Sequence, residues 1–117
     1  MFSFHTTQLE ERWKKFSFVE QMGNVGSEVH RALLWREKDK NIFQNSIYRA
    51  LELLDFTIRA DTRREGIREL TRVREFLCGI LLGEKNYGIT LEILDDYFFQ
   101  FALAAKLRTP QKPYESR

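Results

Sequence analysis

The sequence predicts an all-α protein, specifically an up-down four-helix bundle with a long first helix. Apolar residues recur at alternating spacings of three and four over most of the chain, as they do along one face of a helix. Both prolines lie in the last eight residues, so the preceding chain lacks the strongest helix breaker. No segment shows the alternation of apolar and polar residues that is typical of a half-buried strand. At 117 residues, the chain is expected to form one domain over 1–108, with a flexible tail over 109–117.

The first helix is expected over residues 7–38. Its apolar face continues through Gly23 and Gly26 without a change of phase, although each glycine inside a helix costs about 1 kcal/mol relative to alanine. We therefore expect one long helix whose small residues let a neighbouring helix approach closely, with a break near 23–26 as the alternative. This apolar face consists of Phe18, Met22, Val25, Val29 and Ala32 or Leu33.

A charged turn over 36–41 separates the first helix from the second, which is expected to extend to Ala60. Asp61 and Thr62 then supply N-cap chemistry for a third helix near 62–82, and Gly83 suits the residue just beyond its C-terminus. The apolar faces are Phe43, Ile47, Leu51, Leu54 and Ile58 in the second helix, and Ile67, Leu70, Val73, Leu77 and Leu81 in the third.

The fourth helix is expected to follow a loop over 84–89. Thr90 is a suitable N-cap residue, and the carboxylates of Glu92, Asp95 and Asp96 suit the positive end of the helix dipole. Short links between four amphipathic helices favour antiparallel neighbours, which gives the up-down arrangement. The inner face of this helix carries Leu91, Leu94, Phe98, Phe101 and Ala105.

Composition and charge exclude several classes of protein. Apolar residues make up 43% and charged residues 31% of the chain, a globular composition. A net charge of +2 lacks the basic excess of a dedicated nucleic-acid or membrane-surface protein. Cys78 is the single cysteine, so no intramolecular disulfide can form. Because neither a signal peptide nor a membrane-spanning apolar run is recognisable, the sequence predicts a cytoplasmic protein with no membrane partner.

The second and fourth helices each carry more apolar surface than one amphipathic stripe requires. A surface helix of a monomer normally has one apolar stripe, so a second stripe is covered either inside the bundle or by another chain. The aromatic cluster over 97–101, in the middle of the fourth helix, favours another chain, and a homodimer is the commonest case. The candidate interface consists of Leu53, Phe56, Phe99, Leu103 and Leu107.

Arg74 is the most informative polar residue. It lies about 40° from Leu70 on a helical wheel, inside the apolar arc of the third helix. A buried guanidinium requires a carboxylate partner, and Asp55 has the matching position on the second helix. Glu20 and Glu28 are the alternatives. The arrangement predicts either an internal ion pair that fixes helix register or a polar pocket that binds a ligand.

Three arginines form a row at helical spacing on the outer side of the third helix: Arg64, Arg68 and Arg72. Such a row can contact phosphates, which makes a nucleic-acid accessory function the second hypothesis. However, Glu65 and Glu69 are interleaved at pairing distance, and no aromatic residues alternate with the arginines to stack on bases. An ordinary solvated helix face is therefore favoured.

No set of residues points to catalysis, to a metal or to a cofactor. The two histidines lack the Glu-x-x-His spacing of di-iron bundles, and Cys and His together are too few for zinc. The glycines of the first helix do not form a phosphate-binding loop. His30 lies at the edge of the first helix's apolar face and is interpreted as a core histidine with a hydrogen-bond partner.

Three segments carry a resemblance to known proteins. The strings EQMGNVGSEVHRALLW, RALELLDFTI and RELTRVREFLCG together resemble a set of short bacterial helical proteins with no assigned activity, over about residues 13–105. The chain's size also resembles the HEPN class of helical bundles. The arginine that precedes the catalytic histidine in ribonucleases of that class is missing before both His5 and His30.

The sequence therefore predicts a non-enzymatic interaction protein that acts as a homodimer or binds a protein partner. The two alternatives are a nucleic-acid accessory protein and a ligand-binding or enzymatic pocket around Arg74.

Overall fold

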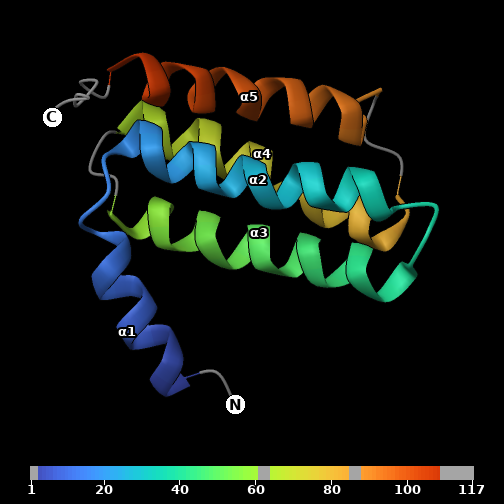
Figure 1. Cartoon of the computed structure of the whole chain (residues 1–117), viewed down its shortest axis with the longest axis horizontal. Helices are drawn as coiled ribbons and strands as arrows, with labels where there is room; N and C mark the ends of the chain where they lie inside the picture. The colour runs from blue at the N-terminus through green and yellow to red at the C-terminus, as the bar shows by residue number, and fades with distance from the viewer. Residues whose placement is uncertain (1–2, 61–63, 85–87, 109–117) are drawn as a thin grey trace, which may run out of the picture.

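The computed structural model describes residues 3–60, 64–84 and 88–108 (Figure 1). These residues form α-helices and no strand, so the predicted all-α class is confirmed for the described part of the chain. The helices are α1 (Ser3–Trp13), α2 (Phe18–Trp35), α3 (Lys40–Ala60), α4 (Arg64–Leu82) and α5 (Leu91–Arg108).

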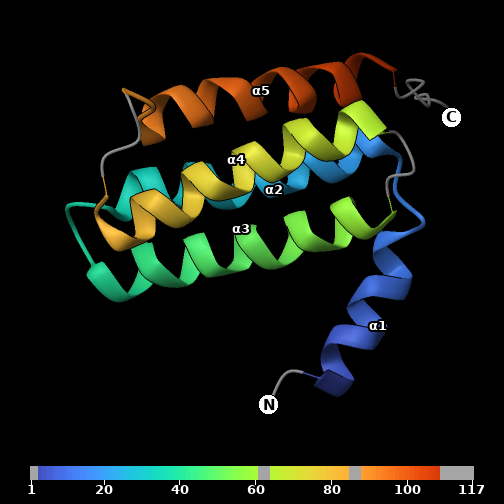
Figure 2. The ribbon, with the colours of Figure 1, turned by 180° about the vertical axis from the view of Figure 1, so that it is seen from behind.

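Helix α2 lies between α3 and α5 and packs extensively against both, with α4 behind it (Figures 1 and 2). Consecutive helices from α2 to α5 run in opposite directions, while α1 extends away from the end of α3 (Figure 1). Helix α4 also contacts α3 and α5, but its contacts with them are far less extensive than those made by α2. The fully buried core side chains come from all four of these helices and include Met22, Val25, Val29, Ile47, Leu54, Leu70, Leu77, Leu91 and Phe98.

The predicted single helix over 7–38 is wrong, because the chain leaves the helical path between Trp13 and Phe18. A capping box starts the second of the two helices. The Glu20 amide donates to Ser17 Oγ at 3.1 Å, and the Ser17 amide donates to Glu20 Oε1 at 2.8 Å. Two backbone donors that would otherwise lack a partner are satisfied in this way, which fixes the start of α2 at this position.

The end of α1 is stabilised from α2 by the buried side chain of Gln21. Its Nε2 atom donates to the carbonyl oxygen of Trp13 at 2.9 Å and to that of Phe16 at 3.2 Å. The last carbonyls of a helix have no partner within the helix. The Gln21 amide therefore supplies hydrogen bonds that the break in the helix would otherwise leave unmade.

The glycines of the first predicted helix lie inside α2 and face α5, so the alternative break near 23–26 is also wrong. A Cβ atom added at Gly26 would lie 2.6 Å from Phe98 Cβ, and one added at Gly23 would lie 3.2 Å from Ala102 Cα. The close helix approach expected from these two glycines is therefore present. At these two glycines, the backbone of α2 lies in direct contact with α5.

Most other helix boundaries lie where the sequence places them. Asp39 Oδ1 accepts from the amide of Asn41 at the start of α3, and Gly83 follows α4 with a φ of 73°. Thr90 Oγ1 accepts from the amide of Ile93 at 3.2 Å, as expected for the N-cap of α5. The predicted caps Asp61 and Thr62 and the predicted tail over 109–117 lie outside the described residues.

Helix α1 packs against the end of α3 through one buried aromatic side chain and one ion pair. Trp13 is 6% exposed, and its Nε1–H donates to Thr57 Oγ1 at 2.8 Å. Near it, Arg59 Nε donates to Glu10 Oε2 at 2.8 Å. This hydrogen bond lowers the pKa of the Glu10 carboxyl, so the pair stabilises the fold above the usual carboxyl pKa and loses that effect as the pH falls.

Candidate functional site

The outer surface of α5 carries a row of exposed apolar side chains. Phe99 is 62% exposed, Leu103 47% and Leu107 77%, each one helical turn from the next. The opposite face of the same helix is held in the core, where Phe98 is fully buried against Gly26 of α2. The tight contact between α2 and α5 therefore directs the apolar row into solvent.

A charged residue lies near each end of this row. Asp96 precedes Phe99 by one turn, and Lys106 follows Leu103 by one turn, both exposed on the outer side of α5. Neither charge forms an ion pair with another residue of the described chain. We use the term α5 outer face for the surface formed by Asp96, Phe99, Leu103, Lys106 and Leu107.

The other half of the predicted interface is not available, which corrects the prediction for Leu53 and Phe56. Leu53 is 7% exposed and lines a cavity together with Leu9 and Trp13 of α1. Phe56 is 2% exposed, and the guanidinium of Arg59 lies 5.2 Å from its ring centroid. Because the C-terminal end of α1 meets α3 near Leu53, and Arg59 lies against Phe56, this second apolar stripe of α3 is covered within the chain.

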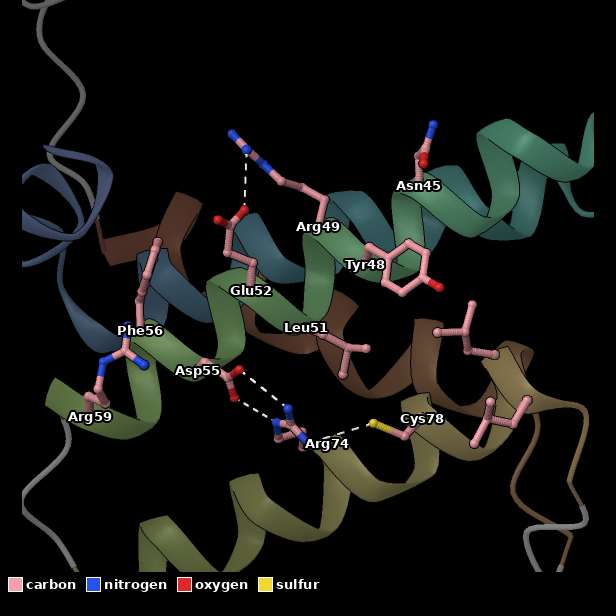
Figure 3. Close-up of a pocket in the computed structure, with 12 residues that line it drawn as sticks. Asn45, Tyr48, Arg49, Leu51, Glu52, Asp55, Phe56, Arg59, Arg74 and Cys78 are labelled. Carbon is pink, nitrogen blue, oxygen red and sulfur yellow. Dashed lines mark hydrogen bonds and ion pairs between the residues drawn. The ribbon is translucent and has the colours of Figure 1, made fainter. Parts of the chain in front are cut away.

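A groove of about 1040 Å³ separates α3 from α4 (Figure 3). Arg74 extends from α4 and Asp55 from α3, and the two side chains meet inside the groove (Figure 3). Arg74 Nε donates to Asp55 Oδ1 at 2.6 Å, and its Nη2 donates to Oδ2 at 3.4 Å. The third nitrogen, Nη1, lies 3.6 Å from Cys78 Sγ. The hydrogen bond with Asp55 raises the pKa of the Arg74 guanidinium above its already high usual value.

The structure thus brings Arg74 and Asp55 together, but it does not bury them. Their side chains are 39% and 35% exposed, because α4 stands apart from α3 and water reaches both groups in the groove. The two alternative partners are elsewhere. Glu20 belongs to the capping box, and Glu28 Oε1 is buried beside a cavity between α1, α2 and α3 with no hydrogen-bond partner among the described residues.

The exposure of the pair sets the expected size of its contribution to stability. In a double-mutant cycle of Arg74→Met with Asp55→Asn, we expect a coupling energy of about 0.5–1 kcal/mol, well below that of a buried pair. Urea unfolding of the four proteins measures it. As a control, Arg74→Met combined with Glu52→Gln should be additive, because Glu52 lines the same groove but pairs with Arg49. Additivity in the Asp55 cycle as well would contradict the ion pair.

Two of the three predicted nucleic-acid contacts can be placed. Arg68 and Arg72 are exposed on α4, whereas the side chain of Arg64 lies outside the described part of the structure. Glu69 lies between them on the same helix, and its Oε2 accepts a hydrogen bond from the Tyr97 hydroxyl of α5. Arg68 and Arg72 also line a cavity between α4 and α5.

His30 is not a core residue, which corrects that interpretation. Its side chain is 55% exposed, and Nδ1 lies 3.1 Å from Asp95 Oδ1 on α5. The expected hydrogen-bond partner is therefore present, but at the surface of the α2–α5 contact. Cys78 is half-buried beside Arg74. Among the described residues, no three His, Cys, Asp or Glu side chains gather closely enough to hold a metal ion.

Comparison with known protein families, with curated proteins and with solved structures gives no match to this chain. The resemblance to short bacterial helical proteins therefore stays a prediction. Within the described part of the chain, no helix combines the length and apolar character needed to cross a membrane.

Proposed function

We propose that the protein is a non-enzymatic, cytoplasmic interaction protein that acts as a homodimer through its α5 outer face. In this proposal α2, α3, α4 and α5 form an up-down four-helix bundle that holds the interface rigidly. The exposed row of Phe99, Leu103 and Leu107 carries the proposal. Contiguous exposed apolar side chains on a folded protein are typical of a surface that another molecule covers.

The charges on the α5 outer face favour a second copy of the same chain as the occupant. When two copies of α5 pair antiparallel about a twofold axis, Phe99 of each copy lies at the level of Leu103 of the other. The same register sets Asp96 of each copy at the level of Lys106 of the other. A twofold interface must be self-complementary, and this helix face is so in both apolar character and charge.

Sedimentation equilibrium at micromolar concentration tests the interface. The wild-type chain is expected to show about twice its 14.0 kDa mass and to dissociate on dilution, because a single helix pair forms a small interface. Leu103→Glu should give a monomer, since it places two carboxylates in the apolar centre of the interface. The matched control is Leu82→Glu, which changes a comparably exposed leucine on α4 and should leave the dimer intact.

A charge reversal distinguishes pairing with a second copy from binding of a different partner. Asp96→Lys alone should weaken the dimer about tenfold, because it sets two positive charges at the same level of the paired helices. Asp96→Lys combined with Lys106→Asp should restore wild-type affinity. A wild-type monomer over the whole concentration range would contradict the homodimer, and failure of the double variant to recover would contradict the antiparallel register.

The remaining hypotheses have less support from the described residues. For nucleic acid, the overall charge of +2 provides little of the basic excess on which binding to a phosphate backbone depends. For a ligand pocket at Arg74, two of the three guanidinium nitrogens already donate to Asp55. An engaged guanidinium has less to offer an incoming ligand than an unpaired one.

A further inference from the structure

A second cavity lies between α4 and α5, and it is lined by apolar side chains together with two arginines. Its volume is about 400 Å³, within the range of small-molecule pockets. Helix α4 lies in front of α2 and below α5 when the molecule is viewed from behind (Figure 2). Helix α5 is held tightly against α2 by the glycine contact, whereas α4 packs only loosely against α5, and the cavity lies between α4 and α5. The apolar floor is formed by Val73, Phe76, Ile89, Ile93 and Leu94.

Two guanidinium groups stand at the rim of this apolar floor. Arg68 and Arg72 are one helical turn apart on α4, so both project to the same side. Both are exposed, and neither pairs with a carboxylate among the described residues. Arginine stays protonated under all physiological conditions and presents several N–H donors in a planar fork that matches a carboxylate or a phosphate.

Among the described residues that line this cavity, the one carboxylate, Glu69, is engaged in a hydrogen bond. Glu69 Oε2 accepts from the hydroxyl of Tyr97, which reaches across the cavity from α5. Burial of the phenol, together with the Glu69 carboxylate, raises the pKa of Tyr97, so the hydroxyl remains a donor at neutral pH. The contact ties Glu69 to α5, and no ion pair joins Glu69 to Arg68 or Arg72.

We infer that this cavity binds a small amphipathic anion. An acyl or aryl body would lie on the apolar floor, and a carboxylate or phosphate head would bind to Arg68 and Arg72. Pockets of this kind combine a mostly apolar lining with a few convergent polar groups that fix the orientation of the ligand. A cationic ligand is disfavoured because the positive charges of Arg68 and Arg72 would repel it. A purely apolar ligand would form no hydrogen bond with either guanidinium group.

Titration calorimetry with decanoate and with decyl phosphate tests the inference, and decyltrimethylammonium, which has the same alkyl body, serves as the control ligand. All three are used below their micelle-forming concentrations. One decanoate or decyl phosphate should bind per chain, and the cationic analogue should not bind. Tighter binding of decyl phosphate would identify a phosphate head, and tighter binding of decanoate a carboxylate head. Equal binding of the cationic analogue would overturn the inference.

Variants at the rim separate this cavity from non-specific apolar binding. Arg72→Gln should weaken binding of the preferred anion about tenfold, the loss typical of one charge-assisted hydrogen bond. The control is Arg31→Gln, which removes an exposed guanidinium from α2. It lowers the net charge by the same amount as Arg72→Gln and should leave the affinity unchanged.

Substitution of Glu69 is expected to raise the affinity for the anion, whereas substitution of the arginines lowers it. Glu69→Gln keeps an acceptor for the Tyr97 hydroxyl but removes the negative charge from the rim, so the anion should bind several-fold more tightly. Unchanged thermal midpoints would show that the variants remain folded. If Arg68→Gln combined with Arg72→Gln bound decanoate and decyl phosphate as the wild type does, the arginines would not be the site.

Discussion

Trp13→Ala is expected to destabilise the protein by about 3–5 kcal/mol, the usual loss for truncating a buried tryptophan. The indole is 6% exposed, and its Nε1–H donates to Thr57 on α3. The main-chain carbonyl of the same residue accepts from Gln21 on α2. One residue therefore joins α1 to both neighbouring helices, and its loss should also uncover the apolar side chains of Leu53 and Phe56.

Urea unfolding followed by far-UV circular dichroism measures this loss. Trp13→Phe should have an intermediate effect, because it keeps an aromatic ring but lacks the donor to Thr57. Trp35→Phe is the control, since Trp35 is partly exposed at the end of α2 and should cost less than about 1 kcal/mol. A Trp13→Ala protein as stable as the wild type would show that α1 does not contribute to the folded core.

Gly26→Ala is expected to destabilise the protein by about 1–3 kcal/mol, as overpacking of a well-packed contact does. The new methyl group would lie 2.6 Å from Phe98 Cβ, an atom that moves only if α5 moves. Alanine is favoured over glycine inside a helix by about 1 kcal/mol, so the steric cost must exceed that gain for the predicted loss to be seen.

Gly23→Ala provides a graded comparison in the same helix. The added Cβ would lie 3.2 Å from Ala102 Cα, so a shift of a few tenths of an ångström removes the conflict. The gain in helix propensity should offset the free-energy cost of that shift, so the unfolding midpoint should be nearly unchanged. A midpoint for Gly26→Ala equal to or above that of the wild type would contradict the close approach of α2 and α5 at Phe98.

The sequence predicts α3, α4 and α5 to within a few residues because each has a clear apolar phase and recognisable end signals. Thr90 and Gly83 have the roles that their residue types favour. The start of α2 also has a signal, since Ser17 and Glu20 have the spacing of a capping box. The apolar phase alone does not reveal this start, because a short interruption changes that phase little.

The two apolar stripes illustrate what the sequence does not determine. Leu53 on α3 and Leu103 on α5 both belong to second apolar stripes, yet the first is buried and the second exposed. Both residues are leucines, so residue type does not separate the two cases. The difference is that the C-terminal end of α1 packs against α3 beside Leu53, whereas no described segment covers the outer side of α5. A helical wheel therefore identifies a second stripe without showing which segment, if any, covers it.

For Arg74, the sequence predicts which residue it faces but not how far apart the two helices lie. The phases of the two helices correctly set Arg74 opposite Asp55, because both residues lie at the same angle from their apolar stripes. Their exposure could not be predicted, since it depends on how far α4 stands from α3. That spacing is a property of how the helices pack in three dimensions, and a helical wheel carries no information about it.

The contact between Gly26 and Phe98 also has a consequence for synthesis on the ribosome. Helices α2 and α3 are neighbours in sequence and can pair as soon as both have emerged. The glycine face of α2 has to wait for α5, which is made only after α3 and α4. Contacts between distant segments form late because a long loop must close first. During translation, the surface of α2 around Gly23 and Gly26 is therefore expected to stay uncovered until α5 leaves the exit tunnel.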